Sequence, residues 1–291
     1  MPQIPKPAER LILESDFNYV VTVHNKEALL PDVLSGVEEA ASEGARVIIV
    51  LDGCTDGSAA VAERFQAGST LDVQLVEAPD VHEVKAINIG LRQTRPGYCI
   101  ILQDDVVLCE PNLENMIRAL CDDHNGAIGF ISLRLATNLK PTSIADRLKW
   151  FLRTRRVQYL SPMTDDHQTV AAKHEHLDVA KVPYGVFVPR MVGIKSPVCI
   201  TPELRRLEPL LDEQFAPYCY DDYDLSIRSL RAGLVNGLFA VHFKSELEWG
   251  GTRQDSTFSS AFGASIRLRN RRLLWKKHRT FLRNVKGVSA W

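Results

Sequence analysis

Short apolar runs alternate with segments whose apolar residues recur at helical spacing along the first half of the chain. Continuous apolar runs predict strands buried on both faces, as in a parallel sheet, and the segments between them predict crossover helices. Predicted strands cover 18–23, 46–51, 71–76, 100–102 and 127–133, and predicted helices cover 30–41, 61–65, 84–91 and 111–120. This order indicates βαβ units with right-handed crossovers and therefore an α/β fold.

The periodic pattern weakens between residues 140 and 181, where a basic amphipathic piece precedes a polar segment. We expect a loop there, and its histidines lack the spacing of a closed zinc site. The other predicted elements are strands at 182–188 and 198–201, a helix from Asp221 to Gly233, a strand ending at His242 and a basic helix over 265–285.

Composition and charge add constraints on compartment and partners. Six cysteines are scattered without paired spacing, which is typical of free thiols in a reducing compartment. The sequence shows neither a signal-peptide core nor an apolar window long enough to span a membrane, so we expect a cytoplasmic protein. Nine Lys and Arg residues and no acid follow Asp255, although the formal net charge of the whole chain is −1. This asymmetry favours an anionic partner for the C-terminal helix.

Polar and acidic residues gather where three predicted strands end. They are Thr22, His24 and Glu27 at the first strand, Asp52 at the second, and Asp104 and Asp105 at the fourth. Ligands of parallel α/β sheets bind outside the carboxyl ends of the strands, and carboxylates bind hard cations that hold a diphosphate. The set therefore predicts a nucleotide site, although the same residue types are also common in helix-capping turns.

Four later features each have two interpretations. Lys85 is either a cation near phosphate or a solvated residue on a helix face. Asp221 and Asp222 either pair with a helix dipole or provide a general base toward a hydroxyl. His242 is either bonded within the fold or part of a metal site, and Trp249 either stacks on a sugar ring or covers the core.

Five motifs stand in the order and rough spacing of the family 2 glycosyltransferases with the GT-A fold, which the chain resembles over about residues 18–275. They are Tyr19–Glu27 (YVVTVHNKE), Val50–Gly57 (VLDGCTDG), Lys85–Gly90 (KAINIG), Gln103–Asp105 (QDD) and Tyr220–Leu225 (YDDYDL). The resemblance implies a Rossmann-like, mostly parallel sheet flanked by helices, with a small antiparallel extension on the acceptor side. It also implies a single domain, with a nucleotide-sugar half over about 18–135, an acceptor half over about 136–260, and a basic C-terminal helix and tail over 261–291.

The resemblance further implies metal-dependent, inverting sugar transfer from a nucleoside-diphosphate sugar to a hydroxyl of a glycan or lipid-linked acceptor, with a UDP-sugar as the favoured donor. The expected site residues are Thr22, His24, Glu27, Asp52, Lys85 and Asp104 for the nucleotide, Asp105 and His242 for Mn²⁺ or Mg²⁺, Asp222 as catalytic base, and Asp221 and Trp249 for the acceptor. Arg269 and Asn270 resemble a recurrent Arg-Asn pair in the helix behind the family's site.

The chain departs from the family pattern at three positions. Gln103 and Asp221 replace an acid and a Glu that are common there, and Leu51 stands where many members have an additional Asp. The Gln-x-x-Arg-Trp motif of processive synthases is absent, which argues against a polymerase. The alternatives are a nucleotidyltransferase, which should show a Gly-rich or basic phosphate loop, and a non-catalytic sugar- or membrane-surface-binding protein, which should have lost the acids.

The basic segments at 147–156 and 267–286 also have two interpretations. Either they make peripheral contact with an anionic membrane at its inner face, or they form amphipathic helices whose charges are solvated. Nucleic acid is not an expected partner, because no stacking aromatics are interleaved with these basic residues.

Overall fold

The structure is a computed structural model that describes residues 15–135, 184–193, 195, 197–244 and 260–284. Its strands are β1 (Phe17–Val23), β2 (Arg46–Asp52), β3 (Asp72–Ala78), β4 (Tyr98–Gln103), β5 (Val107–Leu108), β6 (Ile128–Leu135), β7 (Phe187–Pro189), β8 (Val198–Ile200), β9 (Val235–Val241) and β10 (Phe243–Lys244). Its helices are α1 (Leu30–Ala40), α2 (Ser58–Gly68), α3 (Glu83–Leu91), α4 (Leu113–Asp123), α7 (Pro202–Leu207), α8 (Asp221–Arg231) and α9 (Ser260–Asn284), and a 3-10 turn covers Glu213–Phe215.

Eight strands form one sheet in the order β3-β2-β1-β4-β8-β6-β9-β7, and β10 and β5 form a second, two-stranded sheet. The first four strands pair in parallel, as do β6 and β9. The short strands β7 and β8 run antiparallel to their neighbours. The predicted mostly parallel α/β sheet is therefore confirmed, and the small antiparallel sheet is present too.

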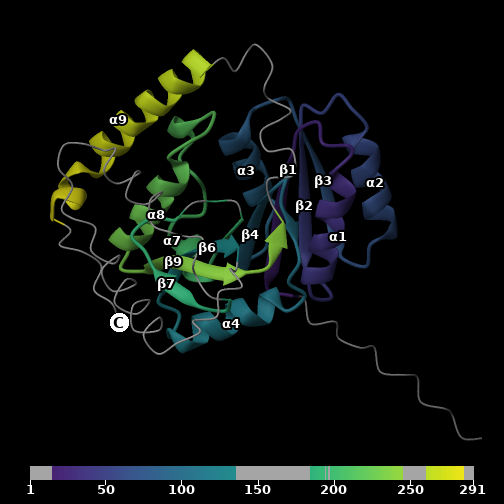
Figure 1. Cartoon of the computed structure of the whole chain (residues 1–291), viewed down its shortest axis with the longest axis horizontal. Coiled ribbons are helices and arrows are strands. Elements are labelled where there is room, and N and C mark those ends of the chain that lie inside the picture. The colour runs from purple at the N-terminus through teal and green to yellow at the C-terminus, as the bar shows by residue number, and fades with distance from the viewer. Residues whose placement is uncertain (1–14, 136–183, 194, 196, 245–259, 285–291) are drawn as a thin grey trace, which may run out of the picture.

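The central strands are buried on both faces, as their continuous apolar runs predict. In β1, Tyr19 and Val21 face one apolar cluster that includes residues of α1 and α4, whereas Val20 faces a second cluster that includes residues of α3. The same division continues through β2 and β4. Figure 1 shows the sheet between these helices.

The order of the strands in the sheet predicts a ligand-binding position at its carboxyl edge. Along the sheet the order is β3-β2-β1-β4. Strands β2 and β3 therefore lie on one side of β1, and the next strand in the chain, β4, lies on the other side. Ligands of open α/β sheets bind where the strand order reverses in this way. The loops after β1 and β4 therefore flank the expected ligand position.

Helix α9 lies along one side of the molecule and packs on α8 through a third apolar cluster (Figure 1). Its inward-facing residues include Ile266, Leu274 and Leu282, each at most 5% exposed. None of the helices in the described ranges is both long enough and apolar enough to cross a membrane.

Some predicted features differ from the structure or fall outside it. Helix α7 was not expected; Thr201 caps it by accepting a hydrogen bond from the Leu204 amide, and Pro202 starts its first turn. Of the predicted strand at 182–188, residues 184–186 do not form a strand, and β7 begins only at Phe187. Trp249 and the predicted loop at 140–181, with its basic piece, lie outside the described residues.

Candidate active site

His24 joins the ends of three strands at the carboxyl edge of the sheet. Its backbone N–H, just after β1, donates to Asp104 Oδ2 just after β4, with a distance of 2.8 Å. Its ring Nδ1 lies 2.6 Å from the carbonyl oxygen of Asp52, the last residue of β2. Thr22 is paired in register with Gln103. These contacts bring four of the predicted nucleotide-binding residues together at the point where the strand order reverses.

Asp52 also fixes the segment that follows β3. Its side chain is 1% exposed, and Oδ1 accepts a hydrogen bond of 2.6 Å from the Val81 amide. The carboxylate therefore shapes the rim of the predicted nucleotide site through backbone contacts.

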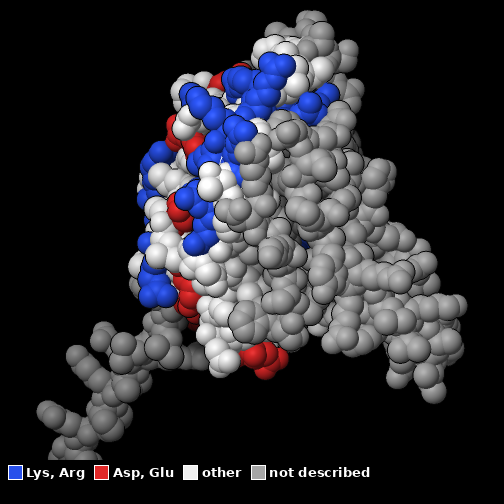
Figure 2. All heavy atoms as spheres, turned by 90° about the vertical axis from the view of Figure 1, so that its left-hand side faces the viewer, with Lys and Arg blue, Asp and Glu red and all other residues white. Residues whose placement is uncertain are grey.

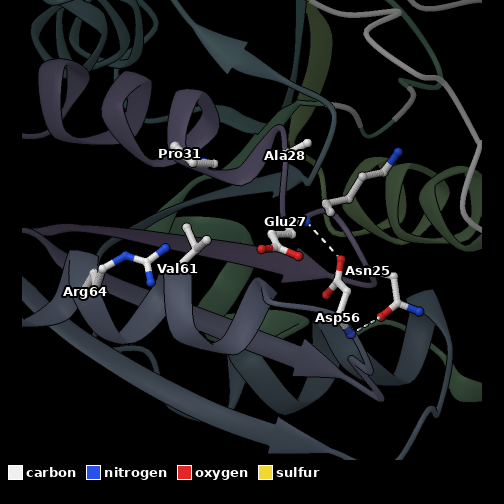
Figure 3. Close-up of a pocket in the computed structure, with 8 residues that line it drawn as sticks. Asn25, Glu27, Ala28, Pro31, Asp56, Val61 and Arg64 are labelled. Carbon is white, nitrogen blue, oxygen red and sulfur yellow. Dashed lines mark hydrogen bonds between the residues drawn. The ribbon is translucent and has the colours of Figure 1, made fainter.

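The loop after β1 is joined to the start of α2 by reciprocal hydrogen bonds. The Glu27 carboxylate accepts from the Gly57 amide at 3.0 Å, and the Glu27 amide donates to Asp56 at 3.0 Å. A Cβ at position 57 would lie 2.3 Å from the Glu27 carboxylate carbon, so a larger residue there would displace the Glu27 side chain. In Figure 3, Glu27 and Asp56 lie at a surface hollow of about 490 Å³ that Arg64 of α2 also lines. Glu27 thus holds the N-terminus of α2.

Asp105, the predicted metal ligand, is buried, and its Oδ1 has no hydrogen-bond partner. Burial raises the pKa of this carboxyl above its usual value, while the Lys26 ammonium acts in the opposite direction and Glu83 adds to the rise. A carboxylate oxygen without a donor in a buried position is suited to a cation. No group of three or more acids, histidines or cysteines able to hold a metal occurs within the described ranges.

Asp221 and Asp222 open α8 and are both buried, with exposures of 0% and 8%. The Oδ1 atom of Asp222 accepts from the Tyr223 amide at 2.9 Å, and Oδ2 accepts from the Lys195 amide at 3.3 Å. Burial and the neighbouring Asp221 raise the pKa of Asp222 to about 7, against the effect of Lys195. A general base is most effective with a pKa near the working pH, and Asp222 meets this condition.

The turn before α8 places these acids. Cys219 and Tyr220 both have left-handed backbone conformations, with φ of 73° and 68°, which is uncommon for residues other than glycine. From α9, the side-chain nitrogen of Asn270 lies 2.8 Å from the Tyr218 carbonyl and 3.1 Å from that of Cys219. Arg269 donates to the Ala216 carbonyl. The Arg-Asn pair therefore acts on the turn that carries the predicted base.

His242 and Lys85 lie near other residues than the strand ends. His242 follows β9 and places its Nδ1 atom 3.4 Å from the buried carboxylate of Glu110, and the ring of Tyr184 stacks on it with centroids 4.5 Å apart. Lys85 is exposed on α3. There its charge is a minor contribution to the lowered pKa of Glu213, after hydrogen bonds from Asn88 and Arg92. These contacts do not link either residue to the strand ends described above.

Residues 19–174 match the model of glycosyl transferase family 2, more than half of the chain. The chain belongs to this family. No curated protein sequence matches it.

Solved structures with the same fold include glycosyltransferases that bind different nucleotide sugars. The mannosyltransferase PcManGT from Pyrobaculum calidifontis, in complex with GDP-Man and Mn²⁺, has a TM-score of 0.55 and 15% identity, over 95% of this chain and 67% of that one. TarS 1–349 from S. aureus, in complex with UDP-GlcNAc, has a TM-score of 0.54 and 12% identity, over 87% and 65%. The longer TarS chain gives 0.50 and 11%, over 79% of this chain and 36% of TarS. This chain thus spans about a third of that longer protein, and the likeness shows the GT-A fold.

Two residues of this glycosyltransferase site were missed by the sequence analysis. Lys195 precedes β8, and its buried ammonium contacts Asp221 and lies 3.3 Å from Glu83 Oε1. Glu83 stands in the first turn of α3 and accepts from the side-chain amide of Gln103. Neither residue belongs to a periodic pattern or a motif that sequence reasoning could use.

Proposed function

We propose that this glycosyltransferase moves a sugar from a nucleoside-diphosphate sugar, with a UDP-sugar favoured, to a hydroxyl of a glycan or lipid-linked acceptor, with inversion at the anomeric carbon. The observation that carries the proposal is the buried carboxyl of Asp222, which two backbone amides hold and which is linked through Lys195, Glu83 and Gln103 to the end of β4. The likeness to enzymes solved with GDP-Man and UDP-GlcNAc supports the donor class.

In the proposed reaction Asp222 accepts the proton of the acceptor hydroxyl. The acceptor oxygen forms its bond to the anomeric carbon while the bond between that carbon and the diphosphate oxygen breaks. His24, Asp52 and Asp104 hold the nucleotide at the strand ends, with Thr22, Glu27 and Lys85 as further proposed contacts. The proposed acceptor contact of Trp249 belongs to the undescribed residues, and the buried position of Asp221 favours another role.

Asp105 is proposed to hold Mn²⁺ or Mg²⁺, which when bound neutralises negative charge on the diphosphate leaving group. The unpartnered oxygen of Asp105 fits this role. Magnesium usually takes one or two protein carboxylates together with substrate phosphates, so a single acid is sufficient. His242 remains a second proposed ligand, although in the structure it faces Glu110.

Calorimetric titration of UDP, GDP and dTDP, with and without Mn²⁺, tests the donor site. We expect metal-dependent binding of one nucleotide that is lost in Asp105→Ala and retained in Asp32→Ala, a control at an exposed acid of α1. Absence of binding by all three nucleotides would contradict the proposal.

We also propose a single domain that meets an anionic membrane at its inner face through α9. One sheet runs through both predicted halves, because β8 pairs with β4 on one side and β6 on the other. Helix α9 contains no acid, and Figure 2, which views the side of the molecule on which α9 lies, shows Lys and Arg side chains on this face with a few acidic side chains between them. Arg272, Lys276 and Arg279 are exposed there. Anionic lipid surfaces attract such groups by about 1 kcal/mol per cation.

Exposed apolar residues accompany this charge. Phe262 is 45% exposed and Leu268 is 40% exposed, and both lie in the N-terminal half of α9, which contacts the turn before Asp222. Docking of this face would bring a lipid-linked acceptor near the predicted base.

Co-sedimentation with vesicles of neutral lipid, or of neutral lipid with anionic lipid, tests the membrane contact. Arg272→Gln/Lys276→Gln should weaken binding to anionic vesicles roughly 30-fold, since it removes two cations. The matched control Arg206→Gln/Arg231→Gln changes exposed arginines of α7 and α8. Equal losses in both pairs would contradict a specific role of α9.

A further inference from the structure

Lys195 is a buried cation among acids from two parts of the fold. Its side chain is 9% exposed, its Nζ forms an ion pair with Asp221, and the same atom lies 3.3 Å from Glu83 Oε1. Its backbone N–H donates to Asp222 Oδ2 at 3.3 Å. One residue therefore contacts both acids that open α8, one through its side chain and one through its main chain.

The charge of Lys195 opposes the repulsion between the two acids. Adjacent buried carboxylates disfavour each other's ionisation, and a nearby cation favours it. Burial raises the pKa of Asp221, and Lys195 acts against that rise. The pKa of Lys195 itself is raised well above its usual value because the surrounding carboxylates outweigh its burial. The ammonium therefore stays charged throughout the working range of an enzyme.

The other groups that act on this cluster come from α3 and from the turn before α8. Glu83 of α3 adds negative charge near Asp221. Cys219 lies near Asp222, and burial together with Glu83 and Asp222 raises the pKa of its thiol to about 12, so it adds no charge. Among the described residues, Lys195 is the cation with the largest effect on the pKa values of Asp221 and Asp222.

Gln103, at the end of β4, connects the Lys195–Glu83 pair to the proposed nucleotide side. Its amide donates to Glu83 Oε1, the oxygen that also lies near the Lys195 ammonium. An acid at position 103 would meet Glu83 with like charge and would lose this hydrogen bond. The uncharged Gln103, next to Asp104 and Asp105, is therefore compatible with the Lys195–Glu83 pair.

We propose that Lys195 is a positioning residue for sugar transfer: its ammonium neutralises Asp221 and thereby favours the ionised form of Asp222, and its backbone N–H fixes the Asp222 carboxylate. This inference rests on the proposed role of Asp222 as the base. It gives Asp221 the role of a buried counter-ion to Lys195.

The pH dependence of kcat/KM separates this role from a purely structural one. Lys195→Met should move the acid limb of the profile upward by roughly one to two pH units, because the loss of a cation favours the protonated form of Asp222. Asp221→Asn should move it downward, and Lys195→Met/Asp221→Asn should return the midpoint to within about half a unit of the wild-type value. Lys195→Arg retains the charge and should leave the midpoint near that of the wild type.

Two results would decide against the proposal or against its foundation. A loss of activity in Lys195→Met with an unchanged pH midpoint, not rescued by Asp221→Asn, would show a structural role only. Full turnover in Asp222→Asn would instead remove the base assignment on which the inference rests. Nucleotide titration and circular dichroism of each variant show whether a loss of activity comes from loss of the donor site or from loss of folding. If Lys195→Met does not fold, the charge-balanced variant Lys195→Met/Asp221→Asn still tests the proposal.

Discussion

Asp52 and Asp104, on the proposed nucleotide side, accept hydrogen bonds from backbone amides, whereas Asp221 and Asp224 of α8 pair with charged side chains. Asp52 and Asp104 accept hydrogen bonds from the amides of Val81 and His24. Asp221 pairs with Lys195, and Asp224 pairs with cations and a histidine of α8 and α9. The first arrangement fixes loops at a sheet edge. The second places charge in the interior, where its removal has larger consequences.

The largest expected effect is on the α8 side, at the predicted base. Asp222→Asn should lower kcat by about 10²- to 10⁴-fold, because the amide cannot take the acceptor proton. Nucleotide affinity should stay within about twofold of the wild type, since the proposed nucleotide contacts lie at the ends of β1, β2 and β4. Steady-state kinetics and calorimetry measure the two quantities. A parallel loss of both would show that the two sides are not separable.

Asp224 provides the next largest effect, on stability. Burial favours the neutral form of Asp224, but the hydrogen bond from His278 and the charges of Arg228 and Lys277 lower its pKa below the usual value. Asp224→Asn should lower the free energy of unfolding by about 3 kcal/mol at pH 7, because it removes the buried carboxylate that pairs with Arg228, Lys277 and His278. Urea unfolding measures this difference.

The pH dependence of that stability difference has a definite sign. Because the folded-state pKa of Asp224 is lowered, its contribution is present above the ordinary carboxyl pKa of about 4 and is lost as the pH falls below it. The gap between the wild type and Asp224→Asn should therefore close in acid. A gap that widens in acid would contradict the assigned ion pairs.

A smaller effect is expected on the nucleotide side. Asp52→Ala removes the acceptor of the Val81 amide and should lower the free energy of unfolding by about 1–2 kcal/mol, because a partly buried donor is left unsatisfied. The same urea titration measures it, with Asp32→Ala as the exposed control. A loss as large as that of Asp224→Asn would remove the distinction between the two regions.

The smallest effect is expected at the outer face of α9. Arg272→Gln/Lys276→Gln should change the free energy of unfolding by less than about 0.5 kcal/mol, since both side chains are exposed. The pair therefore isolates membrane binding from folding. Thermal unfolding checks this, and a drop comparable to that of Asp52→Ala would show that the face is packed against other residues.

The sequence predicted the sheet well because burial on both faces leaves a local signal. The runs of β1, β2 and β4 are apolar without interruption, and their polar ends identify the carboxyl edge. The resemblance to the family directed attention to the acids at the ends of β2 and β4 and at the start of α8. Short elements such as β5, β10 and α7 carry too few residues for any period to be visible.

The partners of the acids could not be predicted from local patterns. Lys195 and Glu83 are 112 positions apart, and His278 meets Asp224 across 54 positions. A buried ion pair has no sequence period, and a lysine or histidine is on average a surface residue. Only the folded arrangement shows that these residues neutralise particular carboxylates.

The short strand β8 determines where Lys195 stands. Cys199 pairs with Ile100 of β4 on one side and with Ile131 of β6 on the other, so both ladders fix the alignment of this strand. A slip by one residue would break both ladders and turn Cys199 away from its apolar cluster. Because Lys195 lies three residues before β8, the alignment of two strand ladders limits which side chain reaches the acids of α8.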